Sequence, residues 1–386
     1  MNTLPLYFDY AATTPVDERV IQVMVECLGA SGNFGNPAST SHRYGQLART
    51  AVERARAQVA ALVGAEAGQI VWTSGATESN NLALKGVAQG HQRGHIITSQ
   101  IEHKAVLDTV FQLEQAGFSV TRLVPDGQGV ISPEGVAAAL RDDTVLVSLM
   151  LVNNELGTVN DVAAIGEVVH QHGALLHVDA AQGVGKLRID LKQWPVDLMS
   201  FSAHKVYGPK GIGALYVGER ARPLLCAQIH GGGHEGGLRS GTLATHQIVG
   251  LGTAFELAGQ LLEGEVLRIG QLRQHLLDLL GDIPGLVVNG SPHQRIEHTL
   301  SLTFTGDAPD LAALAERLAF SSTSACNSSS SQPSHVLLAL GLTPQAARQS
   351  IRLSLGRYTR IEDVDQAVQA IKASLQPQPF WAVAGG

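Results

Sequence analysis

The stretch that decides the fold is DLMSFSAHKVYGPKGIGALYV, residues 197–217. It begins and ends with short apolar runs typical of buried strands, and between them lie a Ser-Ala-His-Lys segment and a turn rich in Gly and Pro. A solvated lysine needs no such surroundings, whereas a lysine at the end of a core strand is held out of bulk water. We interpret Lys205 as a candidate catalytic residue; the alternative is a surface lysine that merely follows a strand.

Strand-like and helix-like segments alternate on the N-terminal side of this stretch, from about residue 70. The run TVLVSLMLV at 144–152 is almost wholly apolar, as expected of a strand buried on both faces. Repeated strand–helix–strand order predicts an α/β protein with a large, mostly parallel sheet covered by helices on both faces. The predicted strands are 69–75, 95–100, 119–124, 144–152, 174–181, 197–203 and 212–217, and the predicted helices between them are 77–88, 103–117 and 162–173.

The pattern changes after Gly250, where a long helical stretch at about 252–280 is followed by short strands and helices. This pattern of elements predicts a smaller α+β domain. We predict that residues 16–250 form a large ligand-binding domain, and that residues 1–15 and 251–386 form the small domain. Ligands of such folds bind at the carboxyl ends of the sheet strands.

Composition excludes several kinds of partner. The chain has 386 residues and a net charge of -7 without a block of Lys or Arg, so we expect neither nucleic acid nor a membrane surface as its main partner. No apolar run approaches the ~20 residues of a membrane helix, and the N-terminus does not resemble a secretory signal. The three cysteines are odd in number and far apart, which predicts neither disulfides nor a metal site and favours a cytoplasmic protein.

Polar residues follow three of the predicted strands. Gly75, Ala76 and Thr77 form a strand-to-helix turn, which is either a phosphate cradle made of backbone N–H groups or a plain helix cap. Asp179 ends a buried strand, where it either caps the next element or pairs with a cation such as a protonated pyridine nitrogen. Asp179 and Lys205 are 26 residues apart at the ends of successive strands. With the Thr77 turn, this combination matches the needs of pyridoxal phosphate, namely a lysine for covalent attachment, an acidic partner for the ring nitrogen and a phosphate cradle.

Three further features have both a functional and a purely structural interpretation. His103 follows the strand at 95–100, where it can stack on a flat ring and move protons, or simply begin a helix. The glycine-rich stretch 229–242 either approaches a ligand or another subunit, or is a flexible surface loop. Cys326 lies in a Ser-rich loop at 321–335, as an accessible nucleophile or an incidental cysteine, whereas Cys27 and Cys226 lie in apolar runs typical of core.

Together these residues resemble the cysteine desulfurases, pyridoxal-phosphate enzymes of the class V aminotransferase group. The resemblance extends over almost the whole chain, and the loop around Cys326 is of the long type found in the housekeeping and nitrogen-fixation desulfurases. It implies a fold-type I pyridoxal-phosphate transferase. The motifs that carry it are YFDYAATTP (7–15), GNPASTSHR (35–43), TSGATESNN (73–81), EHKAV (102–106), VNNELG (152–157), HVDAAQ (177–182), SFSAHKVYGPKGIG (200–213), GGGHE (231–235), RSGT (239–242), SSTSACNS (321–328) and SIRLSLGR (350–357).

The resemblance also implies roles for individual residues. Lys205 would carry the cofactor, Asp179 would keep its ring nitrogen protonated, and Gln182 would bond the ring's phenolic oxygen. His103 would stack on the ring and shuttle protons. The phosphate would be held by Ala76, Thr77, Ser202 and His204, and by Thr242 from the other subunit of a homodimer with shared sites.

For the substrate, the resemblance implies a carboxylate clamp made of Arg352 with Asn154 and Asn36; Asn154 would also contact the cofactor. The implied reaction converts L-cysteine to L-alanine, with the sulfur carried as a persulfide on Cys326 to an acceptor protein for iron–sulfur cluster assembly or thiolation. Two alternatives remain. One is a class V aminotransferase or a selenocysteine or cysteine lyase with the same cofactor. The other is a sulfur-trafficking scaffold without turnover.

Overall fold

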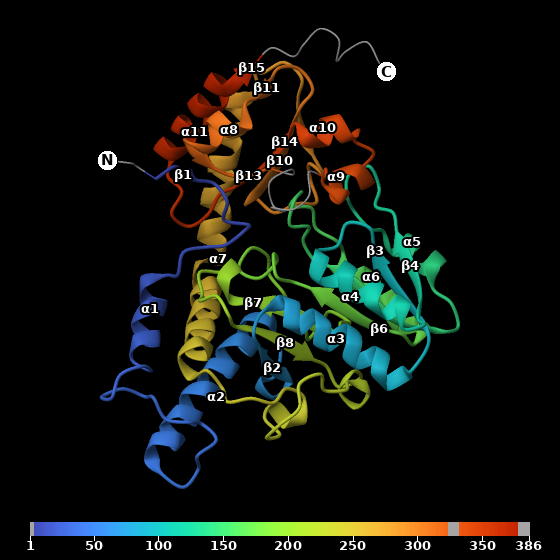
Figure 1. The fold of residues 1–386 in the computed structure, drawn as a ribbon, viewed down its shortest axis with the longest axis vertical. Helices are drawn as coiled ribbons and strands as arrows, with labels where there is room; N and C mark the ends of the chain where they lie inside the picture. Colours follow the sequence, from blue (N-terminus) through green and yellow to red (C-terminus); the bar gives the residue numbers. More distant parts are fainter. Residues whose placement is uncertain (1–3, 323–331, 377–386) are drawn as a thin grey trace.

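A seven-stranded sheet forms the centre of the larger part of the molecule (Figure 1). The computed structural model describes residues 4–322 and 332–376. The strand order is β2-β8-β7-β6-β5-β3-β4, and only β8 runs against the others, so the predicted mostly parallel sheet is confirmed. The strands are β2 (Ile70–Thr73), β3 (His95–Ser99), β4 (Ser119–Leu123), β5 (Thr144–Met150), β6 (Leu175–Asp179), β7 (Leu198–Ser202) and β8 (Gly213–Val217).

Both faces of this sheet are covered, because successive apolar side chains of each strand point to opposite sides. In β7, Leu198 joins the core formed with α3 and α4, whereas Met199 and Phe201 join the core on the other face. This alternation is the reason that the central strands are almost continuously apolar. The covering helices are α3 (Ala76–His91) and α4 (Lys104–Gln115) on one side, and α2 (Arg43–Val63), α5 (Pro133–Ala139), α6 (Val162–His172) and α7 (Thr245–Leu280) on the other.

A second, antiparallel sheet has the order β13-β14-β10-β9 and packs against α11. The N-terminal segment joins it, since the backbone N–H of Ser354 donates to the carbonyl of Phe8. The elements of this part are β9 (Leu286–Asn289), β10 (Thr299–Phe304), β13 (Ser321–Ser322), β14 (Ser350–Ser354), α8 (Leu311–Ala315), α9 (His335–Ala339), α10 (Pro344–Arg348) and α11 (Ile361–Ser374), with the short strands β1 (Leu6–Tyr7), β11 (Ala308–Pro309), β12 (Leu318–Ala319) and β15 (Leu375–Gln376).

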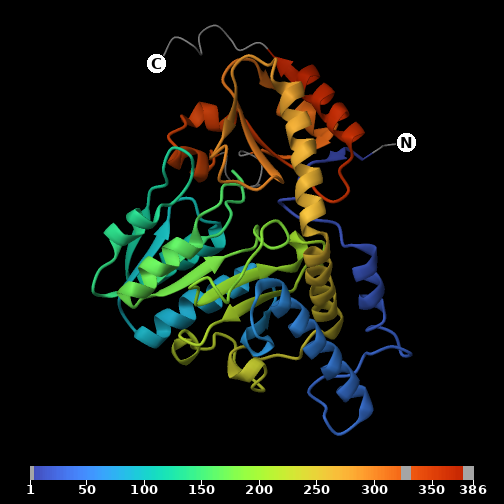
Figure 2. The same ribbon diagram turned by 180° about the vertical axis from the view of Figure 1, so that it is seen from behind.

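Helix α7 belongs to both hydrophobic cores. Its N-terminal half contributes Ile248, Leu251 and Phe255 to the core of the large sheet, and its C-terminal half contributes Leu272 and Leu276 to the core of the small one. At 36 residues it is about 54 Å long, and Figure 2 shows it running from one part of the molecule to the other. The predicted domain boundary after residue 250 falls inside this helix, and the division into domains stays a prediction.

Helix α2 was not predicted, because its buried face consists largely of small residues, among them Ala48, Val52 and Ala55. It packs closely along α7: a Cβ added at Gly252 would lie only 2.6 Å from the Cα of Ala55. A glycine is therefore required at this crossing. The remaining helix, α1 (Glu18–Val25), also lies beside α7. Within the described ranges, no helix has both the length and the apolar character needed to span a membrane.

Candidate active site

A cavity of about 700 Å³ opens where β2, β3, β5, β6 and β7 end. Its position agrees with the rule that ligands of open α/β sheets bind outside the carboxyl ends of the strands. The N-terminal segment, through Asp9 and residues 11–13, forms part of its wall. The cavity brings together ten of the residues singled out by the sequence, namely Ala76, Thr77, His103, Asn154, Asp179, Gln182, Ser202, His204, Lys205 and Arg352.

Lys205 lies in a short 3-10 turn after β7, and its Nζ donates hydrogen bonds of 2.7 Å to the carbonyl oxygens of Ala11 and Ala12. Burial, together with the positive charge of Arg352, lowers its pKa to about 8; the carboxylates of Asp9 and Asp179 oppose this shift. A much larger fraction of this amine is neutral near neutral pH than for an ordinary lysine. A neutral amine is the form that attacks a carbonyl carbon.

Asp179 ends β6, next to β7, and is only 6% exposed. Its carboxylate accepts a 2.7 Å hydrogen bond from Nδ2 of Asn80 and a 3.0 Å bond from the backbone N–H of Ala181. Both donors are neutral, and among the described residues Asp179 forms no salt bridge within 4.0 Å. A buried carboxylate in this state has a strong affinity for a ligand cation.

The first turn of α3 faces the same cavity through Gly75, Ala76 and Thr77. Gly75 occupies the N-cap position with φ 152°, a conformation open only to glycine, and no side chain caps the helix. Ser202 and His204 approach from the end of β7. Nδ1 of His204 lies 3.1 Å from Oγ1 of Thr13, and burial, with the nearby Lys205 and Lys210, lowers its pKa to about 4. A neutral imidazole beside exposed helix N–H groups suits a phosphate.

His103 begins α4, where its Nδ1 accepts a 3.1 Å hydrogen bond from the backbone N–H of Ala105. Because Nδ1 is the acceptor, the neutral ring carries its proton on Nε2. Burial lowers the pKa of His103, while the charge of Asp179 opposes the shift. The ring is thus kept in a form that can accept or return a proton.

Arg352 lies on β14 of the small sheet and reaches across to the cavity. It donates to Oδ1 of Asp9 at 2.7 Å, to Oγ of Ser321 at 2.6 Å and to the backbone carbonyl of Asn154 at 2.8 Å. Its Nε is buried and has no hydrogen-bond partner among the described residues. The guanidinium is thus held in place at the cavity wall, where its positive charge can attract an anion.

Gln182 lies in the turn after β6 and is 6% exposed. Its Nε2 donates to the carbonyl of Ala11 at 2.8 Å, the same oxygen that accepts from Lys205. The amide nitrogen of Gln182 therefore lies beside the amine of Lys205 at the cavity wall.

Three of the predicted residues are not placed in this cavity. Asn36 is exposed on the loop before α2, where its side chain accepts from the backbone N–H of Ala38. Thr242 is also exposed and was expected to act in another subunit, which a single chain does not test. Cys326 lies outside the described residues. The roles of all three stay predictions.

Some residues that the fold brings to the cavity were not predicted from the sequence. Asp9 binds Arg352, Asn80 binds Asp179, and Lys210 lines the end near His204. Asn80 could have been recognised as a polar residue on the apolar face of a predicted helix, and it is fully buried. Asp9 follows the apolar pair Tyr7 and Phe8, the same signal that identified Asp179.

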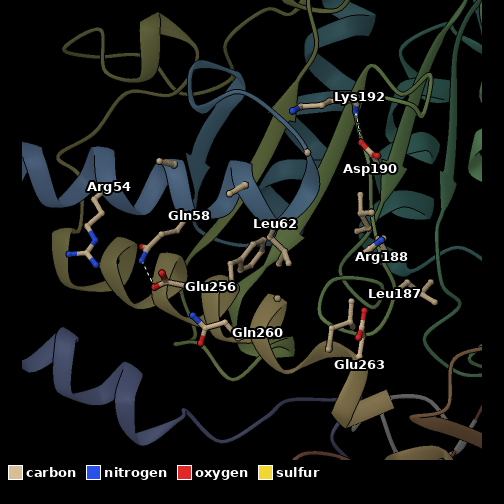
Figure 3. Close-up of a pocket in the computed structure, with 17 residues that line it drawn as sticks. Arg54, Gln58, Leu62, Leu187, Arg188, Asp190, Lys192, Glu256, Gln260 and Glu263 are labelled. Carbon is tan, nitrogen blue, oxygen red and sulfur yellow. Dashed lines mark hydrogen bonds between the residues drawn. The ribbon is translucent and has the colours of Figure 1, made fainter. Parts of the chain in front are cut away.

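A larger cavity, of about 990 Å³, lies elsewhere, between α2, α7 and residues 187–192 (Figure 3). Its rim carries charges of both signs, and Gln58 of α2 is hydrogen-bonded to Glu256 of α7 at 2.7 Å across one side. None of the residues predicted for the site lines it. Since it lacks a lysine–carboxylate pair of the kind formed by Lys205 and Asp179 and an uncapped helix end, we assign the active site to the smaller cavity.

The residues of the smaller cavity fit pyridoxal phosphate. Asp179 has only neutral partners and can accept a bond from a protonated ring nitrogen. The uncapped end of α3 can accept the phosphate, and Lys205 is the amine for the aldehyde. In the described ranges, no group of three or more His, Cys, Asp or Glu side chains is placed to hold a metal ion.

Comparison with known proteins agrees with this interpretation. The aminotransferase class-V family model matches residues 6–367. Cysteine desulfurase IscS of Pseudomonas entomophila (strain L48) is 56% identical over 385 residues, which cover 98% of this chain and 95% of that protein. Among solved structures, a NifS-like protein is similar with a TM-score of 0.88 and 36% identity, covering 96% of this chain and 99% of that chain.

A second solved structure, SspA in complex with cysteine, is 41% identical with a TM-score of 0.81, covering 92% of this chain and 99% of that one. The family match extends over most of the chain, from the N-terminal segment at the cavity wall into α11. The chain therefore belongs to the class V aminotransferase family.

Proposed function

We propose that this enzyme is a cysteine desulfurase that uses pyridoxal phosphate to convert L-cysteine to L-alanine and takes up the sulfur on Cys326. The observation that carries the proposal is the pair of Lys205 and Asp179, which line one cavity at the ends of the adjacent strands β7 and β6. The lysine has a lowered pKa, and the carboxylate has only neutral hydrogen-bond partners. The relatives named cysteine desulfurase support the choice of reaction.

When bound, pyridoxal phosphate supplies an electron sink for the carbon that carries the substrate's amino group. Asp179 holds the proton on the ring nitrogen, which keeps the ring electron-poor. The first turn of α3, with Thr77, Ser202 and His204, binds the phosphate and so fixes the orientation of the ring. Gln182, whose amide nitrogen also donates to the carbonyl of Ala11, would donate to the phenolic oxygen.

Arg352 orients L-cysteine by binding its carboxylate, and the backbone of Asn154 holds the guanidinium in place. Among the described residues that line the cavity, Lys205 and His103 would move protons at the substrate. His103 does so through Nε2, because its Nδ1 is engaged by Ala105.

The sulfur step requires a thiolate nucleophile, and Cys326 is our candidate. Its sulfur attacks the sulfur of the substrate, an S–S bond forms and the substrate's Cβ–S bond breaks. The electron pair of the broken bond is protonated at Cβ. Cysteine plus protein thiol thus gives alanine plus protein persulfide, with atoms and electrons in balance.

A second copy of the chain completes the site in this proposal, with Thr242 reaching the phosphate held by its neighbour and Asn36 assisting the substrate clamp. The persulfide is passed to an acceptor protein. Because the nucleophile must stay a reduced thiol between turnovers, the proposed compartment is the cytoplasm.

The test exposes purified protein to L-cysteine, then measures alanine and the mass of the cysteine-containing peptides. We expect alanine and a gain of one sulfur atom on the Cys326 peptide. Cys326→Ala should keep the bound cofactor's absorbance and lose sulfide release, whereas the control Cys226→Ala should behave as the parent. Undiminished sulfide release from Cys326→Ala would favour a lyase, and a protein that binds no cofactor would favour a non-catalytic role.

A further inference from the structure

A second lysine lies behind the active site and has no place in the mechanism above. Lys186 is partly buried in the turn after β6, four residues beyond Gln182. Its Nζ donates a 2.7 Å hydrogen bond to Oε1 of Gln182. Gln182 in turn donates to the carbonyl of Ala11, and the same carbonyl accepts from Lys205. Lys186 is therefore linked to Lys205 through Gln182 and Ala11.

The direction of these bonds determines how Gln182 is oriented. Nζ of Lys186 donates to the amide oxygen, and the carbonyl of Ala11, which can only accept, faces the amide nitrogen. A Gln side chain without such partners can turn its amide by 180° at almost no steric cost. In Gln182, a rotated amide would point its N–H groups at the amine of Lys186 and its oxygen at the carbonyl oxygen of Ala11. Lys186 therefore keeps the amide nitrogen at the cavity wall.

Within the part of the chain that the structure describes, the surroundings of Lys186 offer it no ion pair, which indicates that the hydrogen bond to Gln182 is its role. No carboxylate lies within 4.0 Å of it among the described residues, and Lys205 and Arg352 face it with like charge. His298 is also near, and Glu265 and Arg357 line the same small cavity. Burial and the like charges lower the pKa of Lys186 to about 7. An apolar side chain would fill this position at lower cost in free energy.

We propose that Lys186 is a positioning residue that fixes the amide of Gln182, so that its N–H group donates to the phenolic oxygen of the cofactor. This inference rests on the proposed function. A hydrogen-bond donor at the phenolic oxygen makes that oxygen a weaker acceptor for the proton on the nitrogen of Lys205. Lys186 therefore keeps the linked nitrogen less basic than it would otherwise be.

The experiment follows the absorbance of the bound cofactor against pH in the holoenzyme, because its colour reports the protonation of the linked nitrogen. For Lys186→Met we expect the midpoint pH of this absorbance titration to rise by about half a pH unit or more. Lys186→Gln, which keeps a donor without the charge, should leave the midpoint closer to that of the parent.

A double-mutant comparison separates orientation from charge. In a Gln182→Ala background, Lys186→Met should shift the midpoint no further, because there is no amide left to orient. An equal shift in both backgrounds would overturn the proposal in favour of a direct charge effect, and so would an unchanged midpoint in Lys186→Met.

Two safeguards keep the outcomes distinct. If Lys186→Met does not fold or bind cofactor, the Lys186→Gln variant tests the proposal instead. A midpoint pH raised as far as in Gln182→Ala would contradict the proposal. A midpoint pH near that of the parent would support it. If the parent itself binds no cofactor, the proposed function fails, which is a different result from a parent that binds and a variant that does not shift.

Discussion

At the scale of single residues, the chemistry of the site depends on removing Lys205 and Asp179 from water. Lys205 loses basicity through burial and through Arg352, and Asp179 retains only neutral partners. Both effects act before any ligand binds, so the apoenzyme is already arranged for its cofactor.

The lowered pKa of Lys205 predicts how cofactor attachment depends on pH. The neutral amine reacts, so the rate at which apoenzyme links pyridoxal phosphate should rise with pH and level off above the folded-state value of about 8. An ordinary lysine would level off only above ~10.4. Absorbance kinetics of apoenzyme measure this directly. Arg352→Gln should move the midpoint upward, because it removes a charge that lowers the pKa; a midpoint of about 10 in the parent would contradict the burial argument.

Asp179→Asn should leave the cofactor bound but lower kcat by about 10² to 10³, because an amide cannot hold the ring nitrogen protonated. The matched control is Asn80→Ala, which removes a neutral hydrogen bond to the same carboxylate and should cost about tenfold or less. Steady-state alanine production, with cofactor content checked by absorbance, measures both. Equal kcat values for Asp179→Asn and the parent would argue against a protonated ring.

At the scale of elements, the first turn of helix α3 is the proposed phosphate site, because it has no side-chain cap. The glycine at its N-cap has two consequences. It permits φ 152°, and it leaves the cavity free of a side chain at this point. Arg239 pairs with Glu78 in the same turn at 2.8 Å, which anchors the loop that carries Thr242.

Gly75→Ala should cost about 1 to 3 kcal/mol of stability, because its φ lies where an L-residue is strained. It should also weaken cofactor affinity by about tenfold or more, since the helix N–H groups lose their alignment with a charged ligand. Gly173→Ala is the control. Gly173 also has positive φ, 92°, with open space around it, but lies at the C-terminus of α6. Thermal unfolding and cofactor titration should show a stability loss in both variants and an affinity loss only in Gly75→Ala.

At the scale of the whole molecule, the two cores are joined by α7 and by the N-terminal segment, and a buried ion cluster ties these together. Arg357 donates to Oδ2 of Asp17 at 2.6 Å, pairs with Glu265 of α7, and lies 4.0 Å from the ring centre of Tyr207. One guanidinium thus connects the start of the chain, the shared helix and the segment after β14.

Arg357→Met should destabilise the protein by about 3 to 5 kcal/mol, because the nearly buried carboxylate of Glu265 loses its counter-ion and that of Asp17 keeps only Arg19. Arg360→Met is the control: Arg360 pairs with Asp363 at the surface, where such a pair contributes about 1 kcal/mol or less. Urea unfolding measures both. Similar losses in the two variants would show that burial of the Arg357 cluster does not matter.

The same cluster predicts a dependence of stability on acid. Hydrogen bonds from Arg19 and Arg357 hold the pKa of Asp17 well below its usual range. Its contribution to stability is therefore present above the unfolded-state value of ~3.9 and is lost as the pH falls toward the lowered value. Urea unfolding between neutral pH and about pH 3 should show a smaller acid-induced loss in Asp17→Asn than in the parent.

Much of the large sheet could be predicted because its signals are local. Strands buried on both faces produce apolar runs such as 144–152, and the polar residues that end them, Asp179 and the turn before Lys205, mark the edge where ligands bind. Helix α2 escaped prediction because small side chains give a weak periodic signal, although they allow the close approach to Gly252.

Local patterns in the chain thus suffice for the strands of the large sheet, the lysine, the carboxylate and the helix end that define the chemistry. Other features depend on contacts between distant segments: the carbonyls of Ala11 and Ala12 that hold Lys205, the pairing of Asp9 with Arg352 across 343 residues, and the lysine behind Gln182. Periodicity and propensity act over a few neighbouring residues. Burial and the resulting pKa values arise only when remote parts of the chain exclude water together.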